Sequence, residues 1–159
     1  MISVAPVRKQ VMVNATQRQA FDLFTAHMSR WWPPTHSILK SPLKEYVIEP
    51  RVHGRWYAVG EDGSTSQTGY VIAWDPPQGV VLAWQLSAEW KFDAKLVTEV
   101  EVRFVAVGAD STRVELEHRH LERMGERAAE VRSMVDAPAG WTGILESFKK
   151  SANGRGGQS

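Results

Sequence analysis

Histidines are the side chains of this sequence best suited to proton transfer, and two of the five have neighbours that suggest a role. His36 follows paired tryptophans and paired prolines in the stretch WWPPTHSI (31–38). His118 shares its strand parity with Val114 and Leu116. Because imidazole titrates close to neutrality, a histidine on a cavity wall can hold a ligand or act as acid or base. No partner for either ring can be identified, so catalytic residues stay unassigned.

Both histidines also have plain structural explanations. A histidine in a loop after two prolines, as His36 is, is typical of a solvated or turn-capping residue, and a hydrogen bond to a ligand is the alternative. His118 is either a core histidine bonded to nearby polar groups or a polar group that faces a cavity. The spacing His118-x-His120 places two rings on one strand face, but a metal ion needs further ligands and no such pattern is visible. We expect neither a metal nor a cofactor.

Other chemistry finds little support in the sequence. It contains no G-x-S-x-G elbow, Walker loop or dinucleotide fingerprint. The absence of cysteine excludes disulfides, thiol catalysis and thiolate metal sites. Glu115 and Glu117 share a strand face with Arg113 and Arg119, and this ladder of opposite charges indicates a solvated face. The chemistry of this chain is therefore expected to depend on shape and apolar contact.

Length and charge narrow the class of protein. A chain of 159 residues suits one domain, and a formal charge of +1 offers no net field for DNA, RNA or an anionic membrane. The N-terminus lacks the pattern of a signal peptide, and no apolar run approaches the roughly 20 residues that span a bilayer. We expect a cytoplasmic protein with no nucleic-acid or membrane partner.

Seven tryptophans are the unusual feature of the composition, and they suit cores, interfaces and ligand cavities alike. Trp31 and Trp32 are either a plug in the core that the following prolines make rigid or, for at least one of the pair, a contact for a ligand. Trp56 and Tyr57 are adjacent in a predicted strand, so one of them should face inward. Trp74 and Trp84 lie on strands joined by a Pro-Pro turn, which suggests a cross-strand aromatic contact.

Periodicity predicts the elements that position these side chains. A strand at 8–13 precedes a helix at 16–27, whose apolar residues recur at helical spacing and which must end before Pro33. Alternating or short apolar runs predict further strands at 46–48, 55–59, 70–74, 80–86, 98–104 and 112–120. Residues 122–150 are expected to be mostly helical, with a bend near Pro138 and Gly140 before a final helix of about three turns.

This order of elements predicts an α+β fold, in which a twisted antiparallel sheet is covered by the last helix. We expect a single domain over residues 1–150. Residues 151–159 are rich in Gly and Ser and are expected to form a flexible tail.

A series of segments, in order along almost the whole chain, resembles one family. The chain is similar to the activator of the heat-shock ninety ATPase, C-terminal-domain type, within the START-like (helix-grip, SRPBCC) superfamily. The matching segments are ATQRQAFDLFT (15–25), WWPPTHSI (31–38), EPRVHGRWY (49–57), GYVIAWDPPQGVVLAWQL (69–86), TEVEVRF (98–104), STRVELEHRHL (111–121) and GWTGILESF (140–148). The sequence departs from the family pattern at His53, where a glycine is common, and at Ala58, where an acidic residue is common.

The resemblance implies a curved sheet of about six to seven strands around a long C-terminal helix, with two short helices after the first strand. It places that last helix over a cavity and the segment after the first helix at one end of it. The resemblance therefore implies that one of Trp31 and Trp32 packs under the helix while the other reaches the mouth of the cavity. Members of the superfamily include small-molecule binders and a few enzymes such as aromatic polyketide cyclases. The chaperone-activating role belongs to larger eukaryotic proteins with an additional N-terminal domain, and we do not expect it here.

Three functions remain open from the sequence. The first is a binding protein that encloses a small apolar or aromatic molecule. The second is a cyclase, dehydratase or hydrolase that uses the same cavity, and the third is a protein-interaction module; a homodimer is compatible with all three. The expected cavity-lining residues are Trp31, Trp32, His36, Trp56, Tyr57, Trp74, Trp84, Val100, Val102, Leu116, His118, Trp141 and Leu145.

Overall fold

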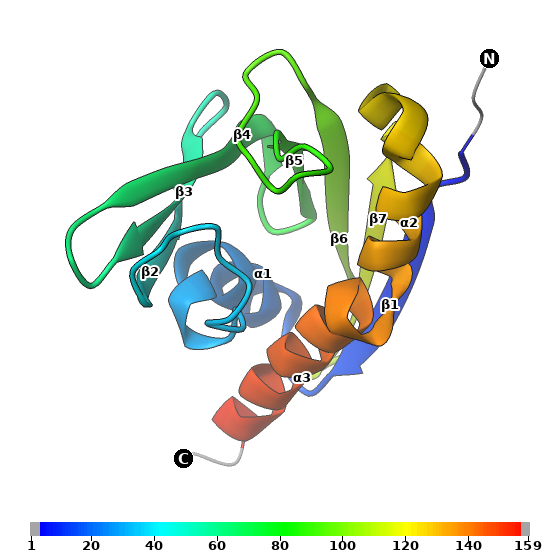
Figure 1. Ribbon diagram of the computed structural model, residues 1–159. Helices are drawn as coiled ribbons and strands as arrows, with labels where there is room; N and C mark the ends of the chain where they lie inside the picture. The colour runs from blue at the N-terminus through cyan, green and yellow to red at the C-terminus, as the bar shows by residue number, and fades with distance from the viewer. Residues whose placement is uncertain (1–3, 157–159) are drawn as a thin grey trace.

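The computed structural model describes residues 4–156 and contains one strongly curled antiparallel sheet (Figure 1). Its seven strands lie in the order β1-β7-β6-β5-β4-β3-β2. Every neighbouring pair is antiparallel. The strands are β1 (Val7–Val13), β2 (Leu43–Ile48), β3 (Arg55–Gly60), β4 (Thr65–Asp75), β5 (Gly79–Trp84), β6 (Thr98–Gly108) and β7 (Ser111–Arg119).

Helices follow the first strand and the last. Thr16 and Gln19 form a capping box that starts α1, and a short 3-10 turn, η1, comes after it. After β7 the chain makes a 3-10 turn, two α-helices and a π-type turn between them. Figure 1 shows α1 inside the curl of the sheet and α3 running across its open side. The helical elements are α1 (Gln17–Ala26), η1 (Met28–Arg30), η2 (Leu121–Arg127), α2 (Ala128–Asp136), η3 (Pro138–Thr142) and α3 (Gly143–Gly156).

The alternating sequences of β6 and β7 separate a dry face from a wet one, as their period predicts. The inward residues of both strands are buried, and so is the apolar stripe that the last helix turns toward them. This arrangement confirms the α+β helix-grip architecture and the two short helices after β1. The buried residues of this interface are Val100, Val102, Phe104, Val114, Leu116, Trp141, Leu145, Phe148 and Ala152.

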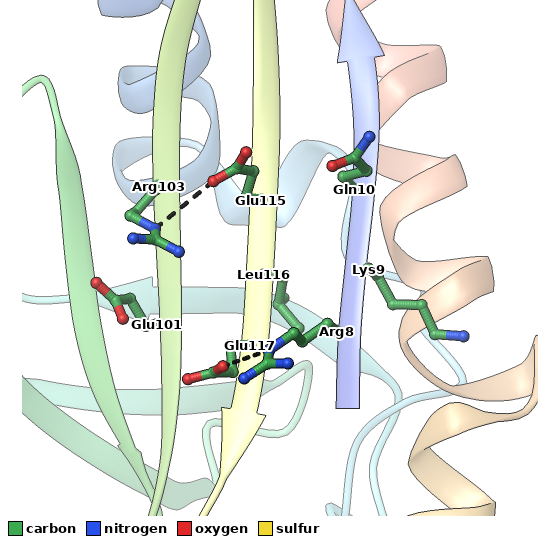
Figure 2. A pocket seen from close by; sticks show the side chains of 8 residues that line it. All are labelled: Arg8, Lys9, Gln10, Glu101, Arg103, Glu115, Leu116 and Glu117. Atoms are coloured by element: carbon green, nitrogen blue, oxygen red, sulfur yellow. Dashed lines mark hydrogen bonds and ion pairs between the residues drawn. The ribbon is translucent and has the colours of Figure 1, made fainter. Parts of the chain in front are cut away.

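The outer face of β1, β7 and β6 carries the charged ladder that the sequence predicts, around a shallow hollow of about 450 Å³ (Figure 2). Arg8 is 2.7 Å from Glu117, and Arg103 is 3.6 Å from Glu115. Arg119 pairs with Glu101 at 2.6 Å. Exposed pairs of this kind add little stability each. Lys9 pairs with Asp136 at 2.7 Å, so the charges of the described residues that line the hollow are already neutralised and offer little attraction to a charged ligand.

The prediction that Trp74 contacts Trp84 across the strands is wrong. In the β4–β5 hairpin Trp74 is opposite Val80, near the turn, whereas Trp84 is opposite Gly69 at the far end. The strand alternation alone did not reveal this, because the distance between two cross-strand residues depends on how far each lies from the turn. Trp74 instead meets Phe21 of α1 edge to face, with ring centroids 5.2 Å apart.

The last helix is longer than predicted, because α3 continues to Gly156 instead of ending at 150. Ala152 is fully buried against the core. The Asn153 side-chain oxygen accepts a hydrogen bond from the Asn14 backbone N–H at 2.8 Å. These contacts offset the weak helix propensity of the Gly/Ser-rich sequence. The remainder of the predicted tail, 157–159, lies outside the described residues.

A search of residues 4–156 for a helix both long enough and apolar enough to cross a bilayer found none.

Candidate functional site

A largely apolar pocket of about 710 Å³ opens where three distant parts of the chain meet. One part is the loop after η1, the second is the end of β5 with the loop that follows it, and the third is the joint between α2 and α3. The lining residues are Trp32, Thr35, His36, Ser37, Ile38, Trp84, Trp90, Met134, Val135, Ala137, Ala139, Gly140, Trp141 and Ile144. This volume falls within the range of roughly 300–1,000 Å³ that is usual for small-molecule sites.

Three tryptophans form a continuous aromatic wall of the pocket. The ring of Trp141 is 5.6 Å from that of Trp84 and 6.1 Å from that of Trp32, centroid to centroid. Both pairs meet edge to face, the geometry that aromatic quadrupoles favour. Each indole comes from a different part of the chain, so the wall exists only in the folded protein.

The joint between α2 and α3 forms one side of the pocket. Ala137 is extended and Pro138 follows it, which ends α2. At Gly140 a Cβ atom would lie 2.3 Å from the carbonyl oxygen of Val135, so the turn needs glycine. Trp141 lies within this π-type turn, just before α3, and its indole points toward the sheet, where it bonds His118. The predicted bend is therefore the feature that keeps α2 and α3 from forming one straight helix.

His118 is fully buried behind this wall and fixes the position of two of its tryptophans. Trp141 Nε1–H donates to His118 Nδ1 at 3.0 Å, which assigns the ring proton to Nε2. Nε2 then donates to Thr98 Oγ1 at 2.8 Å, and the Thr98 hydroxyl donates to the Trp84 carbonyl at 3.3 Å. Burial lowers the pKa of His118 to about 3. The imidazole is therefore neutral near physiological pH and serves as a support.

His36 lies at the pocket edge and joins two of its parts. Its Nε2 is 2.6 Å from the carbonyl oxygen of Ala139, and its Nδ1 is 3.1 Å from Thr35 Oγ1. The backbone carbonyl of His36 also accepts the indole N–H of Trp32 at 2.8 Å. Among the described residues that line the pocket, His36 carries the only ionisable side chain. The histidine thus fastens the loop after η1 to the α2–α3 joint.

Replacing His36 by alanine is expected to lower the free energy of unfolding by about 1 kcal/mol, because a hydrogen bond between two separate segments is lost. Thermal or urea unfolding followed by circular dichroism measures the change. Thr35→Ala removes only the local partner of Nδ1 and should cost less than about 0.5 kcal/mol. Equal stability of His36→Ala and the wild type would show that the bond to Ala139 does not hold the loop.

The paired tryptophans have different surroundings. Trp31 is buried under α1, where its indole N–H donates to the Leu23 carbonyl at 2.9 Å and its ring contacts Phe148. Trp32 lines the pocket. The two indoles also meet each other edge to face, with centroids 5.8 Å apart, so Trp32 joins the pocket wall to the core that contains Trp31.

Trp56 lies in the layer behind the pocket, against both Trp32 and Trp84. It is buried, and its indole N–H has no hydrogen-bond partner in the described part of the chain. Tyr57, its neighbour in β3, is on the opposite face, where the Arg55 guanidinium lies 4.8 Å from the ring centroid. The unpaired indole N–H of Trp56 costs free energy, so it is a tolerated defect in an otherwise apolar layer.

The remaining predicted lining residues are elsewhere. Trp74 borders a different hollow of about 400 Å³ beside α1. Val100, Val102, Leu116 and Leu145 fill the core between the sheet and α3. The structure therefore brings together Trp32, His36, Trp84 and Trp141 at one pocket, with His118 directly behind it.

Several pocket residues could not be identified from the sequence. Ile38 and Trp90 lie in loops, and Met134 lies near the end of α2. All three line the pocket, but no strand or helix periodicity identifies them in the sequence. Trp90 carried one usable signal, since a tryptophan in a polar loop is uncommon and an exposed aromatic often has a binding role.

Comparison with known proteins gives this geometry a family context. The family model described as "Activator of Hsp90 ATPase homolog 1-like protein" matches residues 14–153. A search of curated proteins found no match for the chain.

Solved structures add closer and more distant relatives. The anthrahydroquino-gamma-pyrone synthase Txn09, complexed with SUM, is 35% identical; the alignment covers 92% of this chain and 96% of that one, with a TM-score of 0.66. The self-sacrificing resistance protein CalC from Micromonospora echinospora is 32% identical over 94% and 95% of the two chains, with a TM-score of 0.70. The Aha1 dimer from Colwellia psychrerythraea, at 14% identity, 94% and 97% coverage and a TM-score of 0.62, shares the fold.

Proposed function

Because this chain belongs to the family of activator of Hsp90 ATPase homolog 1-like proteins, we propose that it binds a planar aromatic small molecule in the pocket beside Trp32, Trp84 and Trp141. The observation that carries the proposal is the aromatic wall itself. Flat, rigid rings favour a ligand that can stack on them or meet their edges.

The energetics of such a complex are favourable. Burial of about 200 Å² of apolar ligand surface would contribute roughly 5 kcal/mol at 25 cal/mol/Å². Association and ordering costs reduce this gain. The hydrogen bonds through His118 and His36 hold the wall in place before the ligand arrives, which keeps the ordering cost low.

The name of one relative supports an aromatic ligand. Txn09 is named for an anthrahydroquinone-fused γ-pyrone, which is a flat polycyclic molecule. A ligand of this shape fits the volume of the present pocket and the character of its wall. The same relative favours a second candidate function, the cyclisation of an aromatic substrate in this pocket with His36 as the proton-transfer group.

The two candidates require different observations. Binding without reaction needs only the apolar wall, whereas catalysis also needs His36 to release the Ala139 carbonyl and act on a substrate. A reaction that His36→Gln abolishes while ligand affinity is unchanged would favour the enzyme.

The cysteine-free composition suits the reducing cytoplasm, where we expect the protein to act. A homodimer remains a prediction for sedimentation analysis.

Emodin, a planar trihydroxyanthraquinone, is the probe for the proposed pocket. We expect it to quench tryptophan fluorescence, to bind with a dissociation constant in the micromolar range and to raise the melting temperature by several degrees at saturation. Ala139→Trp adds bulk at an exposed lining position and should weaken emodin binding at least about tenfold, because the ring then occupies the opening.

The matched control is Ala106→Trp, which adds the same side chain at an exposed position in β6, away from the pocket. It should leave emodin affinity unchanged. Equal affinity in the two variants, or the absence of binding by emodin in the wild type, would count against the proposed site.

A further inference from the structure

Trp90 combines two features that are unusual for a tryptophan. Its backbone is left-handed, with φ of 61°, and its side chain is 40% exposed. A left-handed backbone is unfavourable for a bulky residue, whereas histidine, found at the other two non-glycine positions of this kind, tolerates it better. Strain of this sort is often retained at sites that bind or react.

The loop that holds Trp90 explains why the residue has this conformation. The Trp90 N–H donates to the Ser87 carbonyl at 2.8 Å, and the Ser87 N–H donates to the Lys91 carbonyl at 2.8 Å. Leu86 pairs with Phe92 in an isolated antiparallel bridge. This is a tight hairpin whose left-handed position usually carries glycine. Here that position carries the largest side chain available.

The surroundings of the loop restrict where the indole can go. Glu89, next to Trp90, forms an ion pair with Arg127 at 2.7 Å, which ties the hairpin tip to η2. The Trp90 ring meets Trp84 nearly at right angles, with centroids 6.4 Å apart. Trp90 is also one of the residues that line the pocket. The strained residue therefore stands at the pocket rim against one ring of the aromatic wall.

We infer that Trp90 is a specificity-determining residue, which stacks its indole on one face of a planar aromatic ligand while the edge of that ligand meets Trp84, because the two indoles stand nearly at right angles. This inference rests on the proposed function. A ligand in that position would bury the exposed part of the indole, so binding would recover apolar contact that the free protein lacks. A flat ligand can meet both rings in this way and would be preferred over a bulky one.

Variants at position 90 test this with emodin as the probe. Trp90→Phe keeps an aromatic ring and should retain affinity within about threefold, whereas Trp90→Leu and Trp90→Gly should each lose about tenfold or more. Phe92→Ala is the matched control. Phe92 is 39% exposed on the same hairpin but does not line the pocket, so its removal should leave emodin affinity unchanged.

Thermal stability gives a second and independent measure. Trp90→Gly should melt about 2–4 °C above Trp90→Ala, because only glycine relieves the left-handed backbone. Wild-type affinity in Trp90→Leu would overturn the inference, and so would equal losses in Trp90→Phe and Trp90→Gly. If Ala139→Trp still blocks emodin binding when the position 90 variants behave in this way, the proposed pocket is supported and only the role of Trp90 is refuted.

Discussion

A Gly69→Ala variant is expected to lose at least about 3 kcal/mol of unfolding free energy, as much as the removal of a large core side chain. Gly69 is opposite Trp84 in the β4–β5 ladder, next to an irregularity in the β3–β4 pairing. A Cβ atom there would lie 1.7 Å from the carbonyl oxygen of Ala83, so the strands must separate. Chemical unfolding followed by circular dichroism measures the loss.

The position of the clash adds a functional consequence. Because Ala83 precedes Trp84, separation of these strands also displaces one ring of the aromatic wall, and emodin binding should weaken in any folded fraction. Gly154→Ala is the control: it lies in α3 with nothing within 4 Å of the added atom, and it should be neutral or slightly stabilising. Similar melting temperatures for the two variants would refute the steric argument.

The stability of the protein is expected to decrease on acidification, and His118 is the main cause in the core. Burial lowers its pKa to about 3, whereas the unfolded state has a pKa near 6.5. The unfolded chain therefore binds a proton first, so the contribution of the neutral ring is complete above about pH 6.5 and is lost as pH falls toward about 3. The loss is about 1.4 kcal/mol per pH unit and at most about 5 kcal/mol in total.

His118→Phe separates this effect from the titration of carboxylates, which both proteins share. Near neutral pH the variant should be less stable by about 3 kcal/mol, because Trp141 Nε1–H and Thr98 Oγ1 lose their partner. By about pH 4 the difference should approach zero, since the wild type has by then lost a similar amount. A difference that stays constant from neutral to acid pH would show that His118 does not titrate in this way.

Much of the fold could be predicted because its signals are local. Strict alternation in the sequences of β6 and β7 predicts which face of each strand is buried. Pro138 and Gly140 predict the joint between α2 and α3. The ends of elements were less predictable. The final turn of α3 depends on Ala152 and Asn153 finding partners in the core and at Asn14, and such long-range contacts leave no local trace.

The site was harder to predict, because each of its residues depends on distances between separate segments. Parity placed His118 on the inward face but could not distinguish a cavity group from a bonded core residue; the indole of Trp141 decides this. The opposite faces of Trp56 and Tyr57 followed from alternation, but which of the two would approach the pocket did not. Trp90 belongs to no periodic segment, so only coordinates could place it beside Trp84.

The bonded series Trp141–His118–Thr98–Trp84 has a consequence for the range of ligands. These bonds fix one side of the pocket to the buried strands β6 and β7. The other side is formed by two loops, the one after η1 and the one that holds Trp90. The proposed pocket would then admit molecules of different thickness by movement of the loops alone, while the stiff flank keeps its shape. In this family we expect a change of ligand to accompany changes in the loop residues, with the braced strands of the sheet unchanged.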